Sequence, residues 1–192
     1  MFLKFFKLFI AFTTISILLI NCDNRPEAND KVSQDVAFKN MKEADDLEKI
    51  IALYNQYIGD ADNKDKLLLS MGQIAMKMKI SIEEFNKKKD YKNICHLRIV
   101  RSANFGDFVS YDGYHFEKIL NDYPNSEFAA DAEYSLIYIV PDEYNYKNLD
   151  DEKNKLELFL KKYPESNLKN NAKKRYDWIV DYLKNGGQSI VD

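Results

Sequence analysis

One eleven-residue pattern occurs twice and constrains the fold of this chain more than any other feature. The first copy is Phe116-Glu-Lys-Ile-Leu-Asn-Asp-Tyr-Pro-Asn-Ser126, and the second is Leu156-Glu-Leu-Phe-Leu-Lys-Lys-Tyr-Pro-Glu-Ser166. In each copy an amphipathic helix is expected to end at Tyr-Pro, because the residue before a proline avoids the helical conformation, and the serine is placed to cap a following helix. The two Tyr-Pro pairs are 40 residues apart, which is typical of stacked helical repeats.

Apolar residues recur at helical spacings of three and four from residue 44 onward. These spacings predict helices over residues 44–58, 64–79, 91–104, 114–122, 126–140, 149–162 and 167–184. A short helix is also predicted after Ser81, which forms a capping box with Glu84, and Gly186-Gly187 is expected to end the last helix. Because no segment of comparable length alternates with period two, we predict an all-α fold.

Residues 1–21 have the pattern of a secretory signal peptide. Lys4 and Lys7 precede an apolar run of 13 residues, which is shorter than the about 20 residues of a membrane-spanning helix. The run ends in Leu19-Ile20-Asn21-Cys22, which resembles a bacterial lipobox, the site where a cysteine is lipidated and the preceding peptide is removed. This resemblance implies a covalent lipid on Cys22. Asn21 stands where Gly, Ala or Ser is usual, so an uncleaved signal anchor and ordinary cleavage near Asn21 stay open as alternatives.

The predicted organisation has four parts. The signal peptide over 1–21 is followed by a flexible tether over 22–43, which contains almost nothing apolar to bury. The helical domain covers 44–185, and 186–192 form a C-terminal tail. Two or more acyl chains on Cys22 would make a stable membrane anchor where a single chain would not.

Charge and motifs exclude several functions. Without residues 1–21 the chain carries 26 basic against 31 acidic groups, a net charge of −5, which disfavours nucleic acid as a partner. The sequence has no glycine-rich phosphate loop and no nucleophile or metal motif. Cys95-His96 and His115 lack the spacing of paired ligands and are interpreted as a structural thiol beside a surface imidazole. We therefore expect no catalysis, no metal and no cofactor other than the lipid.

The spacing Phe-x-x-Ile-Leu-x-x-Tyr-Pro-x-Ser-x-x-Ala-x-x-Ala over 116–132 is similar to the tetratricopeptide-like repeats of the outer-membrane assembly lipoproteins (the BamD or YfiO type). The second Tyr-Pro copy, followed by Ala172, repeats most of it. The resemblance covers about residues 90–184 and, less closely, 45–80, where Met71-Gly72 matches a Leu-Gly pair. It implies antiparallel helix pairs stacked as a short solenoid, with Gly106-Asp107-Phe108 as the turn within one repeat. It also implies a lipoprotein of the cell envelope, placed in the outer membrane, whose partners are envelope proteins or peptides.

Aromatic residues outside the repeats are the candidates for partner binding. Tyrosine tolerates half-exposed positions because its hydroxyl stays in water, as the rims of binding grooves require. The candidate residues are Phe108, Tyr111, Tyr114, His115, Tyr144 and Tyr146. Two other functions remain open on the sequence: a surface-exposed lipoprotein that binds an external ligand, and a periplasmic enzyme or cell-wall-binding module that uses the aromatic cluster.

Overall fold

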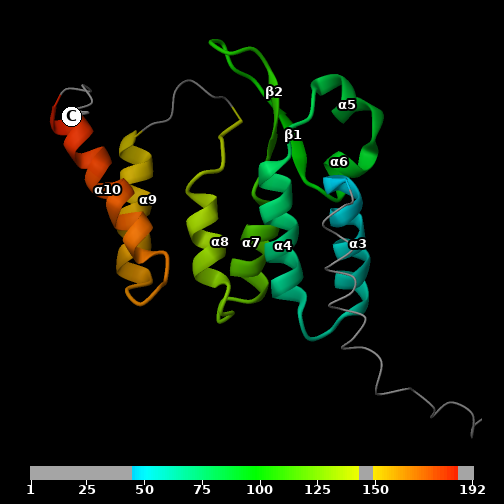
Figure 1. Cartoon of the computed structure of the whole chain (residues 1–192), viewed down its shortest axis with the longest axis horizontal. Coiled ribbons are helices and arrows are strands. Elements are labelled where there is room, and N and C mark those ends of the chain that lie inside the picture. The colour runs from blue at the N-terminus through cyan, green and yellow to red at the C-terminus, as the bar shows by residue number, and fades with distance from the viewer. Residues whose placement is uncertain (1–44, 143–148, 186–192) are drawn as a thin grey trace, which may run out of the picture. The chain divides into compact units, whose positions relative to one another are not determined.

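The computed structural model describes residues 45–142 and 149–185, all within one compact unit that spans Asp45–Asp192 (Figure 1). These residues form eight helices and one two-stranded sheet. The elements are α3 (Asp46–Gly59), α4 (Lys64–Lys77), α5 (Ile82–Lys87), α6 (Lys89–Asn93), β1 (Leu97–Val100), β2 (Phe108–Tyr111), α7 (Tyr114–Asp122), α8 (Ala129–Leu136), α9 (Leu149–Lys162) and α10 (Lys169–Lys184). The predicted signal peptide, tether and tail, and the predicted helix end at Gly186-Gly187, lie outside the described residues.

Helices α3 and α4 lie side by side, and α4 also packs against α7 (Figure 1). The Asp45 carboxylate accepts a hydrogen bond from the Leu47 N–H at the start of α3. The approach of α4 to α7 requires a glycine, because a Cβ on Gly72 would lie 2.6 Å from a ring carbon of Phe116. Phe116 is fully buried, so its ring occupies the space that the missing side chain leaves. The helices predicted over 44–58, 64–79 and 114–122 are therefore confirmed within two residues at each end.

The prediction of a helix over 91–104 is wrong. Only α6 is helical there, and the chain then forms an antiparallel hairpin in which Leu97 pairs with Tyr111 and Val100 with Phe108. Helix α6 ends at Asn93, His96 then has a φ of 53° in the left-handed region, and the β-branched residues Ile99 and Val100 of β1 favour a strand. The all-α prediction is correct for most of the described residues but missed this sheet.

The turn that the family resemblance places at Gly106-Asp107-Phe108 is also not a turn between helices. Gly106 lies in the loop of the hairpin, where its φ is 73°, and Phe108 is the first residue of β2. The hairpin is held to the segment after α8: the Arg98 guanidinium donates to the Val140 carbonyl oxygen and forms an ion pair with Asp142.

Both Tyr-Pro segments form turns between helices, as predicted. In the first turn the Ser126 hydroxyl accepts from the Phe128 N–H at 3.0 Å, and in the second the Ser166 hydroxyl accepts from the Leu168 N–H at 3.1 Å. Each serine thus satisfies a backbone donor just before the next helix, which is the role expected of a cap. The following helix is shorter than predicted in the first case, since α8 ends at Leu136 and only turns continue toward Ile139.

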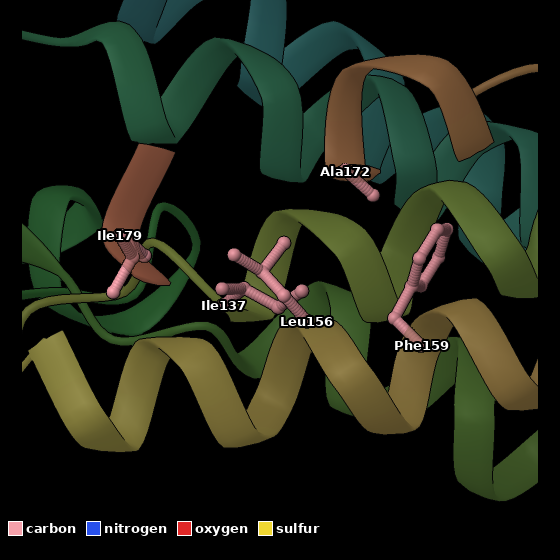
Figure 2. Close-up of a cluster of buried hydrophobic side chains, with 5 residues drawn as sticks. All are labelled: Ile137, Leu156, Phe159, Ala172 and Ile179. Atoms are coloured by element: carbon pink, nitrogen blue, oxygen red, sulfur yellow. The ribbon is translucent and has the colours of Figure 1, made fainter. Parts of the chain in front are cut away.

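Helices α8, α9 and α10 share a hydrophobic cluster, drawn in Figure 2. Its buried members are Ile137, Leu156, Phe159, Ala172 and Ile179. At its edge Glu152, which is 1% exposed, accepts two hydrogen bonds of 3.0 Å from the Arg175 guanidinium. A buried carboxylate is expensive unless it is paired in this way, so Glu152 and Arg175 fix α9 against α10.

Candidate partner-binding site

The six aromatic and imidazole residues proposed from the sequence do not form one exposed surface. Tyr111 and His115 are 2% and 1% exposed, whereas Tyr114 is 40% exposed and Phe108 is half-buried. Tyr144 and Tyr146, together with the lipidation candidate Cys22, lie outside the described residues. Of the four candidates that can be placed, Tyr114 offers the most surface to a partner.

Tyr111 and His115 form a hydrogen-bonded pair inside the protein. The Tyr111 oxygen accepts from the backbone N–H of His115 at 2.8 Å and lies 3.0 Å from His115 Nδ1. Burial, reinforced by the nearby His96, lowers the pKa of His115 to about 3, so the imidazole is neutral at pH 7 and we assign Nδ1 as the acceptor of the Tyr111 hydroxyl. Burial likewise raises the pKa of Tyr111. This pair joins β2 to α7 and supports the surface residues around it.

His96 and Tyr114 form a stacked, partly exposed pair next to His115. Their ring centroids are 3.6 Å apart and their planes differ by 9°. His96 Nδ1 lies 3.8 Å from an Asp112 carboxylate oxygen, and the other oxygen of Asp112 accepts from the Tyr114 N–H at 2.8 Å. Burial acts to raise the pKa of Asp112, but the hydrogen bonds and the charges of His96 and Arg98 outweigh it and lower that pKa. Asp112 therefore holds both rings in place.

The chain has only two histidines, and the fold brings them together although they are 19 residues apart. The rings of His96 and His115 meet edge to face, with centroids 5.1 Å apart. Sequence spacing gave no sign of this contact, because it depends on the positive φ of His96 and on the hairpin. The neighbouring Cys95 is buried as interpreted from the sequence, and burial raises the pKa of its thiol to about 12.

Helix α3 extends the surface beside Tyr114. Burial raises the pKa of Tyr57, and groups on α7 and at its C-cap act on the same hydroxyl: the Lys118 charge opposes the rise, and Tyr123, Asp122 and Tyr114 add to it. The Tyr57 hydroxyl is therefore coupled electrostatically to these side chains. Lys118 and Asp122 form an ion pair of 2.5 Å, in which the two side chains are 28% and 43% exposed.

We call this surface the α3–α7 face. It consists of Tyr57, His96, Asp112, Tyr114, Lys118, Asp122 and Tyr123, all of which are at least partly exposed. Partly exposed tyrosines around a charged pair can bind peptides, since their rings give contact area and their hydroxyls and charges give direction. Sequence reasoning found Tyr114 but missed the α3 contribution, because nothing in the spacing of residues 44–58 indicates which helix Tyr57 faces.

Two further properties concern the described residues alone. Residues 45–142 and 149–185 contain no cluster of three or more His, Cys, Asp or Glu side chains that could hold a metal ion. None of the helices in these same ranges is both long and apolar enough to cross a bilayer.

Comparison with protein-family models, with curated proteins and with solved structures finds no match to this chain. Over the ranges that the structure describes, the class is a predominantly helical domain with one β-hairpin, and its candidate site is the α3–α7 face.

Proposed function

We propose that this protein is a lipid-anchored, non-catalytic scaffold of the cell envelope that binds other proteins through the α3–α7 face. The observation that carries the proposal is the placement of Tyr114, whose N–H donates to Asp112 at 2.8 Å, one turn before Lys118 of the partly exposed Lys118–Asp122 pair on α7. Tyrosines come from two separate elements, and His96 stacks on one of them. Such a surface suits an extended peptide or loop, whose backbone and side chains can meet both rings and charges.

The proposed anchor rests on the sequence. An apolar run that ends in Leu-Ile-Asn-Cys supports lipidation of Cys22, and residues 22–43 would serve as the tether between lipid and domain. About 20 residues of flexible chain would hold the domain at a root-mean-square distance of roughly 25 Å from the bilayer. The partner would then be a protein of the same membrane or its surroundings, and the outer membrane is the proposed location.

The proposed architecture is a tetratricopeptide-like stack of helix pairs. Two equivalent turns 40 residues apart support it, as do the packed pairs α3 with α4 and α9 with α10. The β-hairpin is a departure from a simple series of helix pairs. By resemblance, the most specific form of the proposal is a component of outer-membrane protein assembly.

Capture of partners from detergent-solubilised envelope tests the binding face. The full chain is compared with Tyr114→Ala and Lys118→Glu variants, and with Lys87→Glu as the control, because Lys87 also forms an exposed i,i+4 pair but lies on α5. We expect a partner that the parent and the control retain and the two face variants lose. Equal recovery of a partner in all four samples would place the binding surface elsewhere. Partners that include no component of outer-membrane protein assembly would contradict the specific form of the proposal.

Lipidation has its own test. Fatty-acid labelling of the parent chain is expected, and Cys22→Ser should remove the label and leave an unanchored precursor. A parent chain without label, or a Cys22→Ser variant with an unchanged membrane fraction, would contradict the anchor. Protease treatment of intact cells then separates the two sides of the membrane: rapid loss of the domain would favour a surface lipoprotein that binds an external ligand.

A further inference from the structure

Helix α10 presents an exposed stripe on the side that does not face the cluster of Figure 2. Ala172 and Ile179 point into that cluster, and Trp178 lies about 100° round the helix from Ile179. The stripe, which we call the α10 stripe, consists of Asn171, Lys174, Trp178, Asp181 and Asn185, and each of these residues is exposed. Their spacings of four and three residues place them along one line of the helix surface.

The sequence of the α10 stripe is self-complementary. Trp178 is at its centre, and the stripe reads Asn, Lys, Trp, Asp, Asn. If two copies of α10 run antiparallel across a two-fold axis at Trp178, the Lys174 of each copy faces the Asp181 of the other, and Asn171 faces Asn185. This is the arrangement that an isologous dimer requires, in which the same patch serves both subunits.

The charges at the stripe are available for such a contact. Lys173 pairs with Asp177 at 2.9 Å on the same helix. Lys174 and Asp181, in contrast, have no ion-pair partner among residues 45–142 and 149–185, and they are two helical turns apart, about 10 Å, so they do not reach each other. An antiparallel copy would pair both.

Trp178 is held in place before any contact forms. The Arg175 guanidinium lies 4.5 Å from the centroid of the Trp178 ring, and the Tyr182 ring is stacked on Trp178 with centroids 5.1 Å apart. Arg175 is itself fixed by its two hydrogen bonds to Glu152. Trp, Tyr and Arg are the residues that most often dominate binding energy, and a rigid side chain loses little entropy when it binds.

We propose that the α10 stripe is a contact between two copies of this chain, arranged antiparallel about Trp178. One helix face buries less than the about 1,200 Å² of a typical stable complex, so the dimer is weak and concentration-dependent. This surface is separate from the α3–α7 face, and the proposal does not rest on the function assigned to that face.

Disulfide trapping of the full chain in its membrane tests the geometry. Asn171→Cys and Asn185→Cys variants with tags of different size are expressed alone and together, and the parent chain sets the background. Antiparallel pairing predicts a cross-linked product that contains both tags when the variants are mixed. Each variant alone should stay near background, because the two copies of Asn171 would be about 21 Å apart, far beyond the reach of a disulfide.

Charge reversal tests the chemistry without relying on the trapped cysteines. Dimer formed by the otherwise unmodified full chain in detergent is measured by sedimentation. Lys174→Asp and Asp181→Lys should each weaken the dimer, the double variant should restore it, and Trp178→Ala should raise its dissociation constant by about tenfold or more. Lys169→Asp, an exposed change on α10 outside the stripe, should have no effect.

Three outcomes would overturn the proposal. The first is the absence of a mixed cross-link, and the second is a dimer that does not respond to charge reversal. The third is a chain that stays monomeric and whose Trp178→Ala variant no longer binds some other protein, which would assign the stripe to that partner. Circular dichroism of every variant confirms that the helices are retained, and rescue by the double reversal cannot result from unfolding.

Discussion

The turns at Tyr123 and Tyr163 have the same local structure but different attachments to the rest of the molecule. Each tyrosine N–H donates to the carbonyl four residues before it at 2.9 Å, and each serine caps the N–H two residues after it. The first turn is tied to α4, since the Ser126 hydroxyl also donates to Asp65 at 2.6 Å. The second is tied to α8, where Glu133 accepts from the Tyr163 hydroxyl at 2.8 Å.

The short motif determines the structure of the turn but not its attachment to the rest of the molecule. Tyr-Pro-x-Ser specifies the backbone of the turn, because proline ends the helix and serine caps the next one. The partner at the far side is determined by whichever helix packs opposite, and it lies 61 residues away for Ser126 but 30 for Tyr163. Equal turns can therefore contribute unequally to stability, and four measurements test the two turns and the helices that lead into them.

The largest effect is expected at the two buried phenylalanines, Phe116 before the first turn and Phe159 before the second. Both are 0% exposed, so replacement of either by alanine should lower the free energy of unfolding by about 3–5 kcal/mol. If the two regions fold as one cooperative unit, both variants show a single transition in chemical denaturation. Two separate transitions in either variant would show that the regions are independent.

The next effect is the pH dependence that His115 contributes from α7, the helix that leads into the first turn. The pKa of His115 is lowered from 6.5 to about 3 in the folded protein, so the unfolded chain binds a proton at a pH where the folded protein does not. This contribution to stability is complete above pH 6.5 and is lost as the pH falls toward 3. Between pH 7.5 and 5.0 the loss is about 2 kcal/mol.

Denaturation curves at both pH values measure that loss, with His115→Gln as the control. Glutamine does not titrate, so the variant should lose about 2 kcal/mol less than the parent over the same range. An identical pH dependence in the two proteins would show that His115 is not held neutral in the folded state.

A smaller effect distinguishes the two serines directly. Ser166→Ala should cost about 1 kcal/mol for the lost cap, whereas Ser126→Ala should cost roughly 1 kcal/mol more because the hydrogen bond to Asp65 is also lost. Stability measured by denaturant unfolding gives both values. An Asp65→Ala change should then cost less in the Ser126→Ala background than in the parent, and simple additivity of the two would remove the proposed difference.

The smallest effect concerns the tyrosine hydroxyls. Tyr163→Phe removes the hydrogen bond to Glu133 and should cost about 1 kcal/mol. Tyr123 has no hydroxyl partner in the part of the chain that the structure describes, so Tyr123→Phe should be close to neutral. An equal loss of unfolding free energy in both variants would contradict the proposed difference between the two turns.

The sequence predicted the elements whose signals are local. Helices over 114–122 and 149–162 agree with α7 and α9 at both ends, because each has a continuous apolar face and a Tyr-Pro end. The hairpin was missed for a physical reason: Ile94, Cys95, Leu97, Ile99 and Val100 fit a helical face, but the helix ends at Asn93 and the chain enters β1 after the positive φ of His96.

The candidate site was predictable only in part, for a related reason. Aromatic composition pointed to Tyr114, but burial of Tyr111 and His115 depends on the hairpin packing against α7. Tyr57 joins the α3–α7 face through the packing of α3 and α7 around α4, and such contacts between distant segments leave no pattern in the sequence. The Lys118–Asp122 pair has ordinary i,i+4 spacing, so the sequence alone does not mark it as part of a binding surface.

Photo-cross-linking at Tyr114 in intact cells tests the proposed binding function most directly. A photo-reactive phenylalanine analogue replaces Tyr114 in one full-length variant and Glu165, an exposed residue of the second turn, in another. A protein that binds the α3–α7 face should be cross-linked from position 114 and not from position 165, and Lys118→Glu should reduce the product. No product at position 114, or the same products from both positions, would contradict recognition by this face.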